Sequence, residues 1–213
     1  EIPFAVLAII LVFIMGNDGR LDGAALNILS RADGLAFLAF FLIFLYYTFG
    51  ISRAKGEKEN VEQYTWTTSL LMFIMGVIGL ILGGKLIVDN AVILAATAGL
   101  SEGFIGLTIV AIGTSLPELA TTIVAVKRDH VDLAIGNAIG SNIFNVFWIL
   151  GLTAVVRPLP FDVNANADVL FTILATFLLF AFMFVGRRHK LQRWQGVLFL
   201  LLYIGYMGYA IIR

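Results

Sequence analysis

The sequence predicts an integral membrane protein built of hydrophobic α-helices, and three observations support this fold class. Of the 213 residues, 60% are hydrophobic and only 13% are charged, whereas a soluble domain is about 45–50% apolar and about 25% charged. The mean hydropathy is +0.97. The apolar residues form continuous runs rather than alternating with polar ones, which excludes a transmembrane β-barrel. We therefore expect lipid, not water, to solvate most of the surface.

Composition also excludes several functions. The formal net charge is zero, so a nucleic-acid partner is not expected. The absence of cysteine excludes disulfides, thiolate metal sites and cysteine nucleophiles. The sequence begins with Glu1, and no positively charged segment precedes its first apolar run as in a signal peptide. We expect this start to be cut or processed.

A helix needs about 20 apolar residues to cross the hydrocarbon core of a bilayer. The apolar runs predict about seven transmembrane helices. The first is short for a full span, although Pro3 fits the first turn of a helix. The seven candidates are Pro3–Gly16, Gly34–Gly50, Thr67–Ala98, Phe104–Val126, Val131–Val156, Val169–Gly186 and Trp194–Ile212.

The distribution of Lys and Arg between the connections predicts the orientation. We place the loop at residues 51–66 in the cytoplasm and let successive connections alternate between the two sides of the membrane. Nine basic residues then lie on the cytoplasmic side and four on the other. The nine are Arg53, Lys55, Lys58, Lys127, Arg128, Arg187, Arg188, Lys190 and Arg193. We therefore expect a multi-pass protein of the cell (inner) membrane with a cytoplasmic 51–66 loop and a C-terminus on the opposite side.

An internal repeat links the start and the end of the chain. Arg31–Gly34 and Arg193–Gly196 share an Arg-x-x-Gly pattern, and each glycine is followed four residues later by a leucine, Leu38 or Leu200. The two copies open spans that start on opposite sides of the membrane. Inverted-topology repeats of this kind are a common plan for secondary transporters.

The fourth predicted span contains a proline that should break its helix. Pro117 lacks an N–H group, and its ring clashes with the carbonyl four residues earlier, at Gly113. Irregular backbone at membrane depth is tolerated only beside a cavity or buried protein. We expect the break to free backbone carbonyls, such as that of Ala111, to act as ligands.

Polar side chains surround this break. Glu118 is an ionisable residue inside a span, and such residues are costly there and usually functional. Thr114 lies four residues and Ser115 three residues before it, so all three can share one helix face. Oxygen ligands around a flexible break suit hard cations such as Na⁺ and Ca²⁺. The structural alternative is that the hydroxyls bond back to helix carbonyls while Glu118 snorkels or is protonated.

The fifth predicted span adds a second polar group. Gly136 and Gly140 form a small-residue surface that lets another helix approach closely. Ser141 and Asn145 are four residues apart and share a face, with Asn137 one turn earlier. These side chains can simply hydrogen-bond between helices. Beside Glu118 on the neighbouring helix, we interpret them as part of one shared ion site.

Together these segments resemble the second signature repeat of the cation/Ca²⁺ exchanger superfamily, and most closely the bacterial Na⁺/Ca²⁺ exchanger-like proteins. The resemblance rests on Gly-Thr-Ser-Leu-Pro-Glu at 113–118 followed by Gly-Asn-x-x-Gly-Ser-Asn-x-x-Asn at 136–145. It extends to the order of spans and the charged loop around Arg53–Glu62. The resemblance implies an inverted-repeat fold of about ten helices.

The resemblance also implies roles for individual residues as ligands of the transported ions. Glu118 corresponds to a central carboxylate shared by Ca²⁺ and Na⁺, with oxygens from Thr114 and Ser115 beside it. The Ala111 carbonyl corresponds to an outer-site ligand. The second helix would contribute Ser141 and Asn145. Some relatives carry Asp at the Asn145 position, so this chain has one formal charge fewer there.

The chain departs from the family pattern in one respect. Family members have two signatures in opposite orientation, and here the signature occurs once. We interpret residues 1–50 as two spans that end the first half-repeat, 51–66 as a cytoplasmic loop, and 67–213 as a second half-repeat of five spans. Its ion-site helices are then 104–126 and 131–156. A missing first half, or a second copy of the chain, would complete the site.

The leading functional hypothesis is therefore secondary active transport, with Ca²⁺ exchanged for Na⁺ by alternating access and no cofactor. An H⁺-coupled cation antiporter, in which Glu118 cycles a proton, is the alternative within transport. A half-protein that is inactive without its partner half is a further possibility. An intramembrane hydrolase is not favoured, because Glu118 is the only base near Ser115 in the span. We therefore do not expect an enzyme.

The predicted topology can be tested by cysteine labelling, because the chain contains no native cysteine. A cysteine introduced into the loop Arg53–Glu62 should react from the cytoplasmic side. One introduced into Arg157–Asp168 should react only from the opposite side. Labelling of both loops by an impermeant reagent from one side would overturn the orientation.

Overall fold

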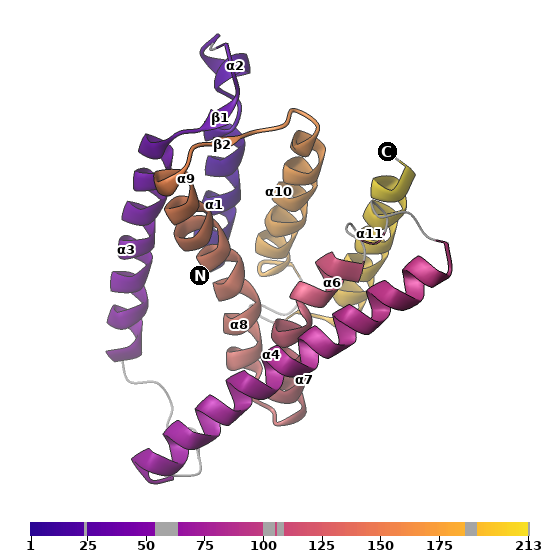
Figure 1. Cartoon of the computed structure of the whole chain (residues 1–213). Helices are drawn as coiled ribbons and strands as arrows, with labels where there is room; N and C mark the ends of the chain where they lie inside the picture. The colour runs from indigo at the N-terminus through magenta and orange to yellow at the C-terminus, as the bar shows by residue number, and fades with distance from the viewer. Residues whose placement is uncertain (24, 54–63, 100–104, 106–108, 186–190, 213) are drawn as a thin grey trace. The chain divides into compact units, whose positions relative to one another are not determined.

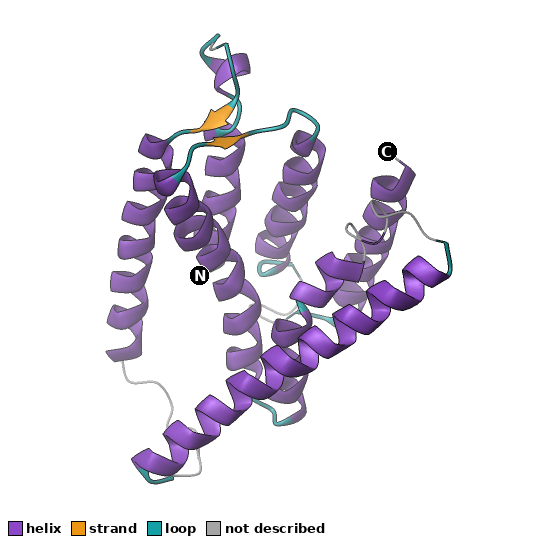
Figure 2. Ribbon diagram, viewed as in Figure 1, coloured by secondary structure: helices purple, strands orange, loops and turns teal. Residues whose placement is uncertain are grey.

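Figure 1 shows the computed structural model, which describes all residues except 24, 54–63, 100–104, 106–108, 186–190 and 213. The chain divides into two compact units. Unit 1 consists of Glu1–Gly56 with Ile135–Tyr203, and unit 2 of Glu57–Ala134 with Ile204–Arg213. Most of the described residues are helical, and the rest form loops, turns and one pair of very short strands (Figure 2).

Unit 1 is a group of hydrophobic helices that pack on one another (Figure 1). Helix α3 packs against α9 and the π-helical segment η2, and α1 packs against α10. The helices of this unit are α1 (Ile2–Met15), the short α2 (Asp18–Leu21), α3 (Arg31–Arg53), most of α8 (Val131–Phe144), η2 (Asn145–Leu150), α9 (Gly151–Val156) and α10 (Ala165–Phe182). Helix α11 (Arg193–Ile212) begins in this unit and ends in the other.

Local sequence explains where helix α3 begins. The Ser30 backbone N–H and hydroxyl both donate to the Asp33 carboxylate at 2.7 Å, and the Asp33 N–H donates to the Ser30 hydroxyl at 3.3 Å. This reciprocal arrangement is a capping box, which satisfies backbone N–H groups left without partners at a helix start. The helix then runs over an apolar segment to Arg53.

Two glycines allow α3 and α9 to approach closely. A Cβ atom on Gly34 would lie 2.6 Å from the Gly151 carbonyl oxygen and 2.8 Å from the Val155 nitrogen. A Cβ atom on Gly151 would lie 2.9 Å from Cβ of Phe37. Close backbone contact between small residues is a principal source of helix association in membranes. Next to this contact, the buried rings of Phe37 and Phe147 lie 6.3 Å apart.

A buried amide pair joins the ends of α1 and α10. The Asn17 Nδ2 donates to Asn166 Oδ1 at 2.7 Å, and Asn166 Nδ2 donates back to Asn17 Oδ1 at 2.8 Å. The two side chains are only 1% and 5% exposed. The two amides hydrogen-bond to each other, so their burial does not carry the free-energy cost of an unsatisfied polar group. Strands β1 (Ile28–Leu29) and β2 (Leu159–Pro160) pair antiparallel and link the connection before α3 to the connection between α9 and α10.

Unit 2 contains the long helix α4 (Trp66–Thr97) and the helices α6 (Ala111–Thr114) and α7 (Leu116–Lys127). The Thr65 hydroxyl caps α4 by accepting a hydrogen bond from the Thr68 N–H. Most side chains of α4 are exposed although the helix is strongly apolar. Contiguous exposed apolar surface of this extent indicates contact with lipid or with further protein.

Within the part of the chain that the structure describes, four helices are long and apolar enough to cross a membrane. They are Arg31–Ile51, Trp66–Thr97, Val131–Val156 and Ala165–Phe182, while Ile2–Met15 is a shorter apolar helix. The prediction of an all-α, multi-pass membrane protein is confirmed. The number of seven spans, the division at residues 50 and 66, and the cytoplasmic side of the loop stay predictions. Most of that loop, residues 54–63, lies outside the described residues.

The glycine contact between α3 and α9 predicts the effect of two matched substitutions. Gly34→Ala should lower the free energy of unfolding by about 1–3 kcal/mol, since its methyl group would press on backbone atoms. Gly50→Ala, on the same helix, meets no atom within 4 Å and should be neutral or slightly stabilising. Unfolding of the two purified variants in detergent measures the difference, and equal midpoints would refute the contact.

Candidate functional site

The helix that carries Glu118 is interrupted where the sequence predicts. Helix α6 ends at Thr114, Ser115 has φ −94° and ψ 1°, and α7 begins at Leu116. Pro117 lies in the first turn of α7, where its missing N–H group removes no helical hydrogen bond. The predicted break is thus confirmed, and it lies between Thr114 and Leu116.

The break changes the hydrogen bonds of the preceding turn. The Ser115 N–H donates to the carbonyl of Ile112, three residues earlier, at 3.1 Å. In a continuous α-helix this N–H would instead donate to Ala111, four residues earlier. The Ala111 carbonyl therefore does not receive its regular bond from Ser115. This geometry agrees with the expected role of that carbonyl as a ligand, which stays a prediction.

Ser115 and Glu118 have the three-residue spacing of a capping box, but the Ser115 hydroxyl does not cap its helix as the Ser30 hydroxyl does. Ser115 is the N-cap residue of α7, yet its side chain makes no cap hydrogen bond to the described residues of that helix. At the start of α3, by contrast, the Ser30 hydroxyl caps the Asp33 N–H. The hydroxyl of Ser115 is exposed and is not used for capping, so it remains available to another group.

Glu118 is held in the first turn of α7. Its side chain is half-buried, and the Oε2 atom is shielded from solvent. The N-terminal end of a helix carries partial positive charge and favours a carboxylate at this position. One turn later, the Thr121 hydroxyl donates to the Pro117 carbonyl at 2.9 Å. The break therefore presents a carboxylate at a helix end inside an apolar segment.

Helix α4 supports the break from the side. A Cβ atom on Gly113, which is buried, would collide with the side chain of Val88, and a Cβ atom on Gly84 would lie 3.9 Å from Cγ of Pro117. Gly84 and Val88 are four residues apart on α4, as are Gly113 and Pro117 on the opposing segment. The broken segment is thus in contact with one face of α4 on both sides of the interruption.

The second predicted group lies on α8 and η2. Ser141 is half-buried, and its hydroxyl donates to the Ala138 carbonyl at 3.2 Å. Asn145 is exposed and is the first residue of the π-helical segment η2. π-Helical segments inside α-helices are often found at functional sites. The sequence does not indicate this irregularity, because Asn145–Leu150 contains neither proline nor glycine.

The structure brings Thr114, Ser115 and Glu118 together around the break in unit 2. Ser141 and Asn145 belong to unit 1. Whether the two groups form one ion site therefore stays a prediction. It rests on the sequence pattern and on the local irregularity of both helices.

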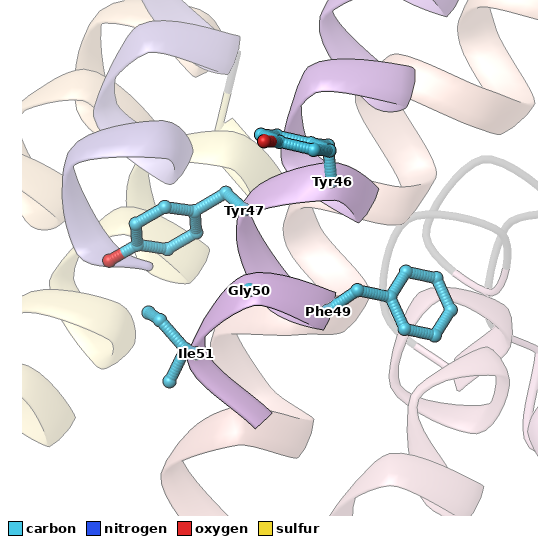
Figure 3. Close-up of a pocket in the computed structure, with 5 residues that line it drawn as sticks. All are labelled: Tyr46, Tyr47, Phe49, Gly50 and Ile51. Carbon is cyan, nitrogen blue, oxygen red and sulfur yellow. The ribbon is translucent and has the colours of Figure 1, made fainter. Parts of the chain in front are cut away.

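A separate pocket of about 470 Å³ lies at the C-terminal end of α3 (Figure 3). It is lined by Tyr46, Tyr47, Phe49, Gly50 and Ile51. The lining is mainly aromatic and aliphatic, and none of these residues is a predicted ion ligand. Tyr47 also packs on the ring of Phe4, at 5.3 Å between ring centroids. This pocket fits the aromatic edge of a membrane span better than a cation site.

Comparison with known proteins gives a consistent result for the chain. A family model described as sodium/calcium exchanger protein matches residues 68–212. An uncharacterized membrane protein of Methanocaldococcus jannaschii is 35% identical over 93% of this chain and 61% of its own length. The sodium/calcium exchanger MaX1 of Methanosarcina acetivorans is 32% identical over 65% of this chain and 39% of its own length.

A solved structure is also similar to the chain. The sodium/calcium exchanger of Methanococcus jannaschii aligns with a TM-score of 0.75 and 32% sequence identity, covering 97% of this chain and 63% of the other. The first relative and this structure show that the chain spans about three fifths of the length of the proteins it resembles.

The position of Asn145 at the start of η2 predicts a change of ion preference upon Asn145→Asp. The new carboxylate would add one negative charge to the polar face. This charge should change the relative affinities for Na⁺, K⁺ and Ca²⁺ and strengthen the binding of Ca²⁺ relative to that of Na⁺. Competition among Na⁺, K⁺ and Ca²⁺ measures the change in a protein that carries both half-repeats. Asn164→Asp, an exposed position at the start of α10, is the control. The same selectivity series in both variants would mean that Asn145 does not face the ion.

Proposed function

The chain belongs to the sodium/calcium exchanger family, and on that premise we propose that it supplies one half of a site that exchanges Ca²⁺ for Na⁺ across a membrane. The observation that carries the proposal is the interrupted helix around Ser115, with Glu118 in the first turn after the break. An ionisable side chain at membrane depth usually marks an ion pathway. Here it adjoins irregular backbone, which membranes tolerate only beside a cavity or buried protein.

The donor atoms at the break suit hard cations. Ca²⁺ takes six to eight oxygen ligands from carboxylates, carbonyls, amides and water. In this proposal Glu118 provides the charge, Thr114 and Ser115 provide hydroxyl oxygens, and Ala111 provides a backbone carbonyl. The Ser115 hydroxyl makes no cap hydrogen bond to the described residues of α7, and the Ser115 N–H donates to Ile112 rather than to Ala111; both observations support these assignments.

Ser141 and Asn145 would supply the second set of oxygens. Their support is the π-helical segment that begins at Asn145, because such a segment rotates the following residues away from regular α-helical positions. With Asn rather than Asp at position 145, the proposed ligands of this chain carry a single formal charge, that of Glu118. A Ca²⁺ ion in a poorly solvated site needs more compensation than one carboxylate provides.

We therefore propose that a facing first half-repeat, or a second copy of the chain in inverted orientation, contributes the remaining ligands. The internal Arg-x-x-Gly repeat and the single signature in this sequence support this arrangement. Transport would follow from alternating access to the shared site. Ions would bind and leave without any covalent step. The site would be open to one side of the membrane at a time, and this alternation would couple the movement of Na⁺ to that of Ca²⁺.

The proposal predicts that Glu118→Gln reduces exchange to the background of empty liposomes while the helix content is unchanged. The substitution keeps the size of the side chain and removes the charge that would bind the cation. Na⁺-driven Ca²⁺ uptake in a reconstituted protein with both half-repeats is the measurement. Asp132→Asn removes an equivalent charge from an exposed position in the first turn of α8 and should leave uptake nearly unchanged.

Two results would count against this assignment. Undiminished Ca²⁺ uptake by the Glu118→Gln variant would exclude Glu118 as the central ligand. Uptake driven by a pH gradient in the absence of Na⁺ would instead favour the H⁺-coupled alternative for the same residue.

A further inference from the structure

Unit 2 contains a second cavity, which none of the predicted ion ligands lines. It has a volume of about 450 Å³ and lies where α4, the second half of α7 and the start of α8 meet. This volume is within the range of about 300–1,000 Å³ that is typical of small-ligand pockets. Its lining residues are Leu80, Ala120, Thr121, Val124, Ala125, Arg128, His130 and Leu133.

The lining separates into an apolar wall and a basic edge. Leu80, Val124 and Leu133 provide large apolar side chains, and each of them is exposed in the structure. Arg128 and His130 lie together at the junction of α7 and α8. A ligand that fits both parts has an apolar body and an anionic group.

A tight turn brings both basic residues to the cavity. The Arg128 N–H donates to the carbonyls of Val124 and Ala125 at 3.1 Å, and the His130 N–H donates to Ala125 at 2.9 Å. Between them Asp129 has φ +60°, a left-handed conformation that aspartate tolerates better than most residues. The carbonyls of Val124 and Ala125 in the last turn of α7 are thereby satisfied by backbone N–H groups, without the Arg128 guanidinium.

The cavity also lies at the end of a predicted span on the basic side of the membrane. Lys127 and Arg128 are among the basic residues from which the orientation of the chain is predicted. A positive side chain close to an anionic lipid headgroup attracts it by about 1 kcal/mol, and of these two residues only Arg128 lines the cavity. Two carboxylates, Asp129 and Asp132, are close in sequence, but they are exposed and neither is among the described residues that line the cavity.

We propose that this cavity binds one anionic phospholipid, with the phosphate at Arg128 and His130 and the upper part of an acyl chain against Leu80, Val124 and Leu133. The apolar wall distinguishes this ligand from a free phosphate, which would gain nothing from three large aliphatic side chains. This inference is independent of the proposed ion exchange, and its readout is lipid retention rather than transport.

The test is native mass spectrometry of the purified 213-residue chain after exchange into mixed phosphatidylglycerol and phosphatidylcholine. The chain should retain phosphatidylglycerol preferentially, and Arg128→Gln should reduce this retention about fivefold, the factor that corresponds to about 1 kcal/mol. Lys127→Gln removes the neighbouring positive charge, which does not line the cavity, and should have a much smaller effect. Val124→Trp should reduce the retention of both lipids by filling the space against the apolar wall.

Three results would overturn the proposal. The first is equal retention of the two lipids by the unmodified chain. The second is an equal effect of Arg128→Gln and Lys127→Gln, which would indicate general surface attraction rather than a site. The third is displacement of the lipid by soluble glycerol phosphate, which would mean that the phosphate group alone is recognised and the apolar wall is not used.

Discussion

The candidate site depends on one constraint, namely that backbone polar groups inside a membrane must be satisfied within the protein or beside a polar cavity. The interruption between Thr114 and Leu116 breaks the regular hydrogen-bond ladder, and the Ser115 N–H bonds to Ile112 instead of Ala111. Such a break is stable only if another polar group, water or an ion binds the backbone groups that have lost their helical partners. The carboxylate of Glu118 in the next turn makes a bound cation a natural partner for those groups.

Close helix contacts stabilise the surroundings of both polar groups in the same physical way. Gly113 faces Val88 of α4 at the break, and Gly34 faces Gly151 where α3 crosses the helix that continues from Asn145. In each case a side chain larger than hydrogen would force the helices apart. The conformation of each irregular segment is therefore supported by an adjacent packed face.

The sequence was sufficient to predict the membrane class, the positions of most helices and the break before Glu118, because apolar run length and proline chemistry act locally. It could not predict the π-helical segment at Asn145, since no residue there has a special backbone preference. The reciprocal pair of Asn17 and Asn166 joins residues 149 positions apart, and the contact of Gly113 with Val88 likewise depends on tertiary packing. The joining of Glu118 with Ser141 and Asn145 remains a prediction for the same reason, because it depends on how separate units assemble.

The central claim is that this chain holds half of an ion site and needs a facing half to exchange ions. The most direct test is Na⁺-driven Ca²⁺ uptake by liposomes that contain the purified 213-residue chain as a demonstrated monomer, compared with a protein that carries both half-repeats. The account predicts uptake by the second preparation and only background uptake by the first. Robust exchange by the monomeric chain would contradict it, because a complete site would then exist within these residues.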